Sequence, residues 1–191
     1  MLLNSERSNW HTIAHRPTDP ERRQLADAPP TVVETVRLAE LLATRATDFV
    51  RMDLEGFEET LFADLVDYAT GCIAGSPVEG GRTFVLPSIL FETHPEYYSS
   101  DGASFEGTLT RMATLGYRCR YLVADRIHAA GTDRLFSEAG YAVDLQVANF
   151  PMADRAIYEG VREEVAFEMI ARTGAVHAAL LEPDNRSIRL G

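Results

Sequence analysis

Cysteine, histidine and tryptophan are all scarce in this chain of 191 residues, which contains two cysteines, five histidines and one tryptophan. Cys72 and Cys119 are far apart and fit no metal-binding spacing, so we expect buried thiols in a reducing compartment rather than a disulfide. No metal site is predicted, because the remaining histidines show no ligand spacing either. These scattered histidines are His11, His15, His128 and His177. Serine and cysteine nucleophile motifs of the G-x-S-x-G kind are also absent.

Basic residues are in the minority as well. Lysine and arginine together number 18 against 29 acidic residues, which gives a formal net charge of -11. No clustered basic patch is present, so nucleic acid and anionic membrane surfaces are not expected partners. No apolar run approaches the roughly 20 residues that span a bilayer, and Met1 to Arg7 lacks the pattern of a signal peptide. We therefore expect a cytoplasmic protein, and its length and hydrophobic content of 46% suit one globular domain.

The most informative stretch runs from Asp48 to Glu59. It predicts a short buried strand at 49–52 that ends in acidic residues and turns at Gly56 into a helix. Glu58 and Glu59 suit the positive end of that helix's dipole. One face of the helix is apolar, with Phe57, Leu61, Phe62, Leu65, Val66 and Ala69. In open α/β sheets, ligands bind beyond the carboxyl ends of the strands, which is where these acidic residues fall.

The rest of the chain alternates between strand and helix patterns, which favours a layered α/β sheet. The expected strands lie at 31–36, 49–52, around 89–91, 117–123 and 141–147. The expected helices lie at 37–42, 57–69, 105–115, 132–139 and 161–172. Residues 89–91 are continuously apolar, as in a strand covered on both faces of a parallel sheet. We divide the chain into an irregular arm at 1–30, a sheet domain at 31–150 and a helical extension at 151–191.

Four side chains at the ends of two predicted strands are candidates for catalysis: Asp53, Glu55, Glu92 and His94. Carboxylates brought together there would raise one another's pKa, and the pKa of a histidine lies near neutrality. Such groups could remove a proton from a reacting hydroxyl.

Structural alternatives stay open for these residues. Asp53 could form an ion pair with Arg51 on the same strand face, and Glu55 could cap the following helix. His94 precedes a proline and could be a turn residue, whereas Glu92 at the end of an apolar strand needs a partner. The roles of three aromatic residues also stay open. Trp10 could stack on a ligand or simply pack, and Tyr97 with Tyr98 could line a substrate entrance or cover a loop.

Several segments, in order, resemble the FkbM-type methyltransferases. Residues 49–58, Phe-Val-Arg-Met-Asp-Leu-Glu-Gly-Phe-Glu, resemble the strand-end signature of that family, an apolar strand followed by Asp-x-Glu-Gly-x-Glu. Residues 35–42 resemble the segment upstream of the signature, 89–95 the next strand, and 115–117 the end of the helix after it. The resemblance covers roughly residues 31 to 123, and the ordered combination is more specific than the Asp-x-Glu-Gly motif alone.

The resemblance implies a Rossmann-like class I methyltransferase sheet and transfer of a methyl group from S-adenosylmethionine to a hydroxyl of a small molecule or sugar. Asp53 would lie near the cofactor's methyl group, and with Glu55, Glu92 and His94 it would form the acceptor side. A Gly-rich loop after the first strand would cradle the cofactor in such a sheet. The chain has no G-x-G-x-G, and its Gly75 to Gly81 loop follows the signature helix. The expected fold is therefore the C-terminal half of the domain, truncated at the N-terminus.

A competing hypothesis is a non-catalytic remnant that serves as a binding or assembly module. Half of a doubly wound sheet exposes a strand edge, which favours pairing with a second copy or with a complementing N-terminal fragment. A third hypothesis, a metal-dependent hydrolase built on the carboxylates, is weaker because no ligand cluster has a suitable spacing.

Overall fold

The computed structural model describes residues 2–3, 11–12, 36–45, 47–73, 84–125, 129–150, 153–184 and 187–188. The chain divides into two compact units, Met1–Val36 and Arg37–Gly191. In the first unit, β1 (Leu2–Leu3) pairs antiparallel with β2 (His11–Thr12). The remainder of the predicted arm, Trp10 included, lies outside the described residues, as do the Gly75 to Gly81 loop and all of the predicted strand at 31–36 except Val36.

The second unit is built on a mixed, open sheet with the strand order β3-β5-β9-β6-β8-β7. Its strands are β3 (Phe49–Met52), β5 (Ser88–Glu92), β6 (Tyr117–Asp125), β7 (Leu145–Phe150), β8 (Ala153–Glu159) and β9 (Val176–Pro183). β3 and β5 are parallel, and every other neighbouring pair in this sheet is antiparallel. A separate antiparallel pair joins β4 (Phe84–Val85) to β10 (Ser187–Ile188). The α/β class predicted from the sequence is confirmed, and the sheet is compatible with a Rossmann-like fold.

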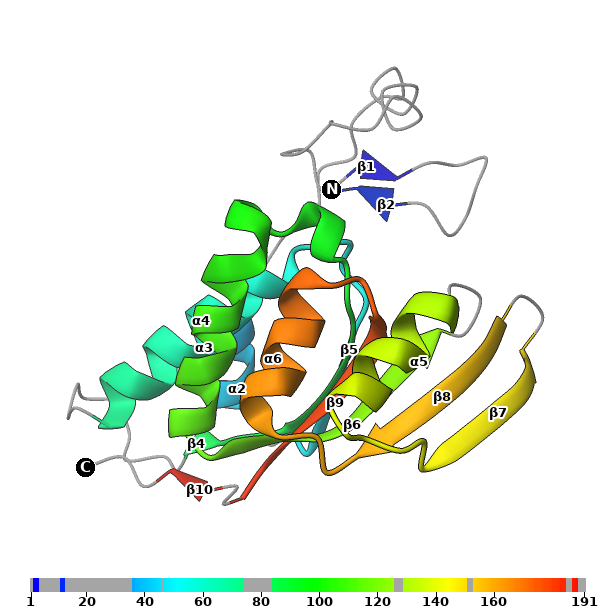
Figure 1. The fold of residues 1–191 in the computed structure, drawn as a ribbon. Coiled ribbons are helices and arrows are strands. Elements are labelled where there is room, and N and C mark those ends of the chain that lie inside the picture. Colours follow the sequence, from blue (N-terminus) through cyan, green and yellow to red (C-terminus); the bar gives the residue numbers. More distant parts are fainter. Residues whose placement is uncertain are drawn as a thin grey trace. The chain divides into compact units, whose positions relative to one another are not determined.

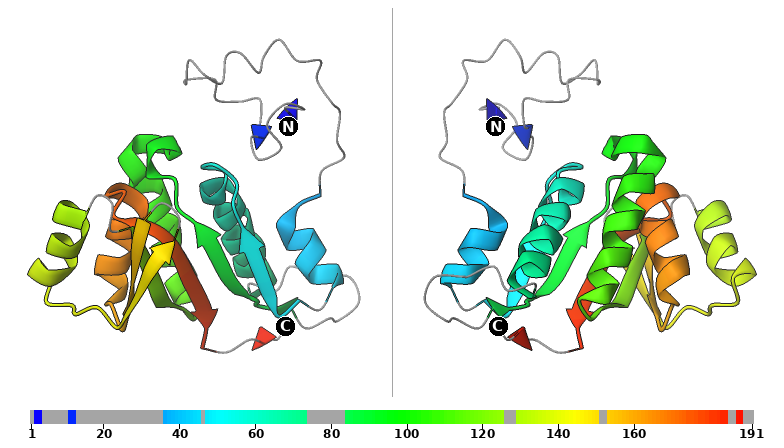
Figure 2. Two further views of the ribbon diagram at one scale, coloured as in Figure 1. Left: turned by 90° about the vertical axis from the view of Figure 1, so that its right-hand side faces the viewer. Right: turned by 90° about the vertical axis from the view of Figure 1, so that its left-hand side faces the viewer.

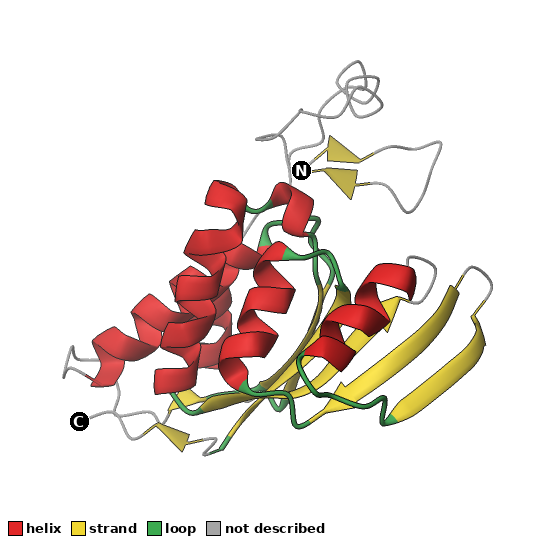
Figure 3. Ribbon diagram, viewed as in Figure 1, coloured by secondary structure: helices red, strands yellow, loops and turns green. Residues whose placement is uncertain are grey.

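The described helices lie on one face of this sheet (Figures 1, 2 and 3). They are α2 (Leu38–Thr44), α3 (Glu58–Ile73), α4 (Ala103–Thr114), α5 (Ala129–Glu138) and α6 (Glu163–Arg172). Two 3₁₀ turns, η2 (Pro95–Tyr97) and η3 (Ser99–Gly102), connect β5 to α4. Among the described residues, no helix is long and apolar enough to cross a membrane.

An aromatic cluster joins the sheet to the helices. The ring of Phe62 on α3 meets that of Phe91 on β5 edge-to-face at 4.9 Å, and it stacks on Phe105 of α4 at 5.6 Å. Tyr98 completes the cluster, with its ring centre 4.5 Å from that of Phe105. Aromatic pairs in such geometries contribute about 0.5–1.5 kcal/mol beyond the burial of their surface. The apolar face predicted for the helix after β3 therefore does contact the core, with Phe62, Leu65, Val66 and Ala69 buried.

The C-terminal part of the chain differs from the predicted helical extension at 151–191. α6 is present, but β8 and β9 join the main sheet, and β9 lies between β5 and β6 at its centre. The segment Val176–Leu181 consists largely of alanine and leucine, most of its residues are buried, and it pairs with β5 on one side and β6 on the other. β5 consequently has a parallel neighbour, β3, on one side and an antiparallel neighbour, β9, on the other. Leu90 is half-buried rather than covered on both faces.

Cys119 on β6 is a free, buried cysteine, as predicted. Burial raises the pKa of its thiol to about 12, so this side chain is an inert core residue rather than a nucleophile. The side chain of Cys72 lies outside the described residues.

Two glycines allow a test of how α4 packs on α6. Gly102 has φ +78°, and a Cβ built on it would lie 1.9 Å from the carbonyl oxygen of Ala171. We expect Gly102→Ala to lower the free energy of unfolding by roughly 2 kcal/mol or more, because a backbone atom would have to move. Gly107 is exposed within α4, and nothing lies within 4 Å of its added Cβ. Gly107→Ala should raise the free energy of unfolding by about 0.5–1 kcal/mol. Urea denaturation of both variants measures the contrast, and equal effects would contradict the packing described.

Candidate functional site

The turn between β3 and α3 determines where the candidate residues lie. Glu55 has φ +55° and Gly56 has φ +93°, and the amide of Phe57 donates to the carbonyl of Leu54 at 3.2 Å. Positive φ at both central residues is the signature of a type I′ turn. A Cβ on Gly56 would lie 2.3 Å from the Cβ of Tyr97, so glycine is required here by both conformation and space.

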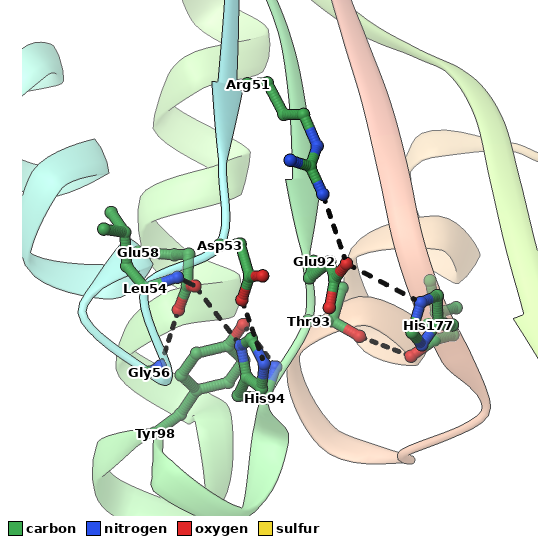
Figure 4. Close-up of polar contacts among 11 residues, drawn as sticks. Arg51, Asp53, Leu54, Gly56, Glu58, Glu92, Thr93, His94, Tyr98 and His177 are labelled. Atoms are coloured by element: carbon green, nitrogen blue, oxygen red, sulfur yellow. Dashed lines mark hydrogen bonds and ion pairs between the residues drawn. The ribbon is translucent and has the colours of Figure 1, made fainter. Parts of the chain in front are cut away.

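The carboxylate of Glu58, at the start of α3, holds this turn in place. Its side chain is 0% exposed, and its two oxygens accept the amides of Leu54 and Gly56, each at 2.8 Å. One of these oxygens also lies 3.2 Å from Nδ1 of His94 (Figure 4). The sequence predicted that Glu58 interacts favourably with the helix dipole, and these hydrogen bonds show that it also holds the turn and contacts His94. Neighbouring Glu59 is also buried, and it accepts hydrogen bonds from the amide and hydroxyl of Ser99 at 2.9 and 2.5 Å.

His94 follows β5, and both its backbone and its ring are held. Its amide donates to the hydroxyl of Tyr98 at 2.9 Å, and its side chain is 13% exposed. With Nδ1 directed at Glu58, the other ring nitrogen, Nε2, lies 3.8 Å from Oδ1 of Asp53. The two ring nitrogens therefore face different surroundings, one the buried carboxylate and the other the partly exposed end of β3.

The pKa of His94 is raised above its ordinary value. Burial alone lowers it, but the hydrogen bond and negative charge of Glu58, together with the charges of Glu55 and Asp53, outweigh that effect. The protonated form of His94 therefore stabilises the fold below the unfolded pKa of about 6.5, and this contribution is lost as the pH rises through the higher folded pKa.

Glu92 at the end of β5 lies beside two cationic or titratable groups. Its Oε1 is 3.7 Å from Arg51 of β3 and 3.9 Å from Nε2 of His177 on β9. β9 is held against the end of β5 by Thr93, whose amide donates to the carbonyl of His177 at 2.9 Å and whose hydroxyl donates to the carbonyl of Val176. These distances are too long for hydrogen bonds, so the two ion pairs orient the Glu92 side chain but leave its carboxylate oxygens able to accept other contacts.

Three of the four sequence candidates come together. One ligand atom from each of Asp53, Glu92 and His94 lies within 4.8 Å of the others, so these side chains could also hold a metal ion. Glu55 stands on the turn with an exposed side chain, and it acts on His94 through its charge. Asp53, Glu92 and His94 therefore lie together at the ends of the two parallel strands, as expected, and their role in catalysis stays a prediction.

The structural alternatives have mixed outcomes. Among the ion pairs of the described residues, Arg51 pairs with Glu92 and not with Asp53, and Glu58 accepts the backbone amides at the helix start. His94 is indeed a turn residue, because it directly precedes the 3₁₀ turn η2, yet its ring also contacts the other candidates.

Sequence reasoning missed Glu58, Tyr98, Thr93 and His177 as parts of this site. Tyr98 is buried, its hydroxyl accepts the amide of His94, and burial raises its pKa, so it supports the loop rather than lining an entrance. The chain does contain a signal for Glu58, a glutamate at the first position of a helix after a glycine turn. No local pattern predicts that β9 brings His177 beside Glu92.

An apolar hollow of about 320 Å³ lies on the sheet face that carries Leu90 and Leu180. It is lined by Leu90, Tyr121, Val123, Asp144, Leu145, Ile157 and Leu180. Apart from Asp144, which directly precedes β7, these residues come from five adjacent strands, and in the register of the sheet Leu90 pairs with Leu180 and Leu180 with Tyr121. Glu92 is two residues beyond Leu90 on the same strand, so it is on this same face. The hollow and the acidic cluster are therefore neighbours along β5.

No protein-family model, curated protein or solved structure matches this chain.

The pKa of His94 provides a test of this geometry. We expect Glu58→Gln to lower it, because the substitution removes both the nearest negative charge and the acceptor of the Nδ1 hydrogen bond. Glu55→Gln is the matched control: it removes a charge that raises this pKa through its Coulomb interaction with the ring, a smaller contribution than that of Glu58, so the decrease should be smaller. An NMR titration of the histidine ring signals, with a chelator present, measures both. Equal decreases would show that Nδ1 is not bound to Glu58.

Proposed function

We propose that this chain carries the acceptor side of an S-adenosylmethionine-dependent O-methyltransferase of the FkbM type. The proposal rests on the convergence of Asp53, Glu92 and His94 at the carboxyl ends of the neighbouring parallel strands β3 and β5. Ligands of Rossmann-like sheets bind at this end of the strands. The resemblance of residues 49–58 to the FkbM strand-end signature names the chemistry that such a site would perform.

The sheet order supports the finer fold assignment, half of a class I methyltransferase sheet. β9 is antiparallel to both of its neighbours, so β6 runs in the same direction as β5. β3, β5, β6 and β7 therefore run in one direction, as in the mostly parallel sheets of Rossmann-like folds, and β9 and β8 run in the other. β3 is an edge strand among the described residues, and the cofactor-binding strands implied by the resemblance would pair with its open side.

The proposed reaction joins a hydroxyl oxygen of the acceptor to the methyl carbon of the sulfonium. Bound S-adenosylmethionine would supply the methyl group and leave as S-adenosylhomocysteine, and Nε2 of neutral His94 would take the proton of the acceptor hydroxyl. Glu58 holds Nδ1, so the ring presents Nε2 beside Asp53, which would lie nearest the methyl group. Glu92 would accept a hydrogen bond from the acceptor and orient it.

The hollow beside Leu90 indicates which acceptors fit. Its volume of about 320 Å³ is within the size range of small-molecule sites, and its lining is mostly apolar. With a net charge of -11, the protein would disfavour anionic acceptors. A small neutral molecule with an apolar body and a hydroxyl group is the expected substrate class.

Binding of S-adenosylmethionine tests this function. The cofactor should be titrated calorimetrically into the chain alone and into an equimolar mixture with a Gly-rich N-terminal fragment of an FkbM-type methyltransferase. We expect micromolar affinity in the mixture, weakened about tenfold by Asp53→Asn, a loss of roughly 1.4 kcal/mol. Glu168→Gln, which removes an exposed carboxylate of α6, should change nothing. Absence of binding in both titrations would contradict the methyltransferase function, whereas micromolar binding by the chain alone would strengthen it and remove the need for a complementing fragment.

The open edge of β3 favours a second candidate function, a non-catalytic assembly module that pairs with another copy of the chain. Phe49 on this strand is 53% exposed, and an exposed apolar edge strand is a template for strand pairing. Leu145 on β7, at the opposite edge of the sheet, is also 53% exposed and gives a matched control.

If β3 is the pairing edge, sedimentation velocity at increasing protein concentration should reveal a dimer. Phe49→Lys should convert this dimer to a monomer, because a charge on the edge opposes strand pairing, and Leu145→Lys should leave it intact. A wild-type monomer at all concentrations would rule out the assembly module, and dissociation by Leu145→Lys alone would place the interface at the other edge.

A further inference from the structure

We propose that Asp53, Glu92 and His94 bind a divalent first-row transition-metal ion of the Mn²⁺ or Zn²⁺ class at the ends of β3 and β5. This site was not expected from the sequence, because its ligands lie on two strands and have no motif spacing. The binding of the ion does not depend on methyl transfer. Its part in activating an acceptor rests on the proposed function.

The distances are close to those of a coordination sphere. The three ligand atoms all lie within 4.8 Å of one another, and Nε2 of His94 is 3.8 Å from Oδ1 of Asp53. Ligands at 2.0–2.2 Å from a tetrahedral ion lie about 3.3–3.6 Å apart. A closing movement of roughly 1 Å between the most distant ligand atoms therefore completes the set. Asp53 can supply it, because its side chain is 44% exposed.

The contact between Glu58 and His94 prepares the histidine as a ligand. Metal-bound histidines usually donate their other ring N–H to a carboxylate, which fixes the tautomer and the direction of the ring. Here the fully buried Glu58 lies 3.2 Å from Nδ1, so neutral His94 carries its proton there and directs the lone pair of Nε2 toward Asp53. Glu58 is in turn held by the amides of Leu54 and Gly56, so this support is rigid.

The charge balance of the cluster also favours a cation. Asp53 forms one ion pair among the described residues, to His94 at 3.8 Å, and Glu92 forms ion pairs at 3.7 and 3.9 Å. These distances exceed those of charge-assisted hydrogen bonds, so the carboxylate oxygens keep lone pairs for a metal. Nearby Glu55 adds a further negative charge, and among the described residues Arg51 is the one arginine that forms an ion pair with the three ligands, through Glu92.

The donor set indicates the class of metal. Carboxylates suit Mg²⁺, Ca²⁺ and Mn²⁺, while an imidazole ligand suits Zn²⁺, Fe²⁺ and other transition metals. One nitrogen and two carboxylates therefore favour Mn²⁺ or Zn²⁺ over Mg²⁺, which prefers oxygen ligands. Three protein ligands leave further positions open, as in catalytic rather than structural sites.

An open position on the ion would take the acceptor hydroxyl. Coordination lowers the pKa of a bound hydroxyl, so its proton leaves to water and the oxygen becomes the nucleophile. In the cation-bound form His94 is a ligand instead of the proton acceptor, and the rest of the transfer is unchanged.

Cation binding is testable on the chain alone, without any cofactor. Mn²⁺ should be titrated into the metal-free protein and the free ion measured by electron paramagnetic resonance, with Zn²⁺ as a competitor and Mg²⁺ as a comparison. We expect one site per chain, displacement by Zn²⁺, and a higher affinity for Mn²⁺ than for Mg²⁺. Asp53→Asn and Glu92→Gln should each raise the Kd at least tenfold, and Glu58→Gln by roughly ten- to a hundredfold through His94. Glu168→Gln should leave it unchanged.

A second measurement separates ligation from damage to the fold. Zn²⁺ should shift the Nε2 resonance of His94 in the wild-type protein, and circular dichroism should show that Asp53→Asn remains folded, because this side chain is partly exposed. Absence of saturable Mn²⁺ binding, or binding that Asp53→Asn and Glu92→Gln leave unchanged, would overturn the proposal. Failure of S-adenosylmethionine to bind would leave it standing, so the two proposals can fail separately.

Discussion

The buried carboxylate of Glu58 is the interaction on which the candidate site depends. Leaving such a charge uncompensated inside a protein costs several kcal/mol, so each of its contacts is a structural requirement. The amides of Leu54 and Gly56 provide two hydrogen bonds, the start of α3 provides a favourable dipole, and His94 provides a titratable partner. The turn after β3, the first turn of α3 and the end of β5 are thereby tied to one side chain.

This arrangement explains how residues far apart in the chain reach one place. β3 and β5 are parallel and in register, so their last residues arrive at the same edge of the sheet. The type I′ turn reverses the chain immediately after Asp53, and Gly56 lets Tyr97 pack directly on it. On the other side, Thr93 binds the backbone of β9 and brings His177 next to Glu92. Local turn geometry and strand pairing together produce the cluster.

Local patterns in the sequence predicted the elements close to the site well. The structure has a strand, a turn and a helix where the sequence predicted them, as β3, the turn at Gly56 and α3. The strand at 49–52 was expected to be buried, however, and this was wrong: β3 is an edge strand in which Met52 alone is buried and Phe49 is exposed. The place of β9 could not be predicted, because strand order depends on contacts between residues far apart in sequence. Its small apolar residues also fit a buried helix or strand equally well. The importance of Glu58 was missed for a similar reason. Whether a glutamate is buried depends on the amide groups that surround it, and the positions of these groups depend on the fold.

The contact between Glu58 and His94 is compatible with two chemical roles of His94, as a base and as a metal ligand. With Nδ1 bound to Glu58, neutral His94 offers a lone pair at Nε2, and that lone pair can accept a proton or a metal ion. The negative charges of Asp53 and Glu55 favour a positive charge at this position, while the adjacent apolar hollow favours a neutral ligand body. An acceptor hydroxyl placed between them would therefore meet a basic or metal-bound edge on one side and an apolar surface on the other. Methyl transfer to oxygen requires both features, because the hydroxyl must be activated and its molecule held still.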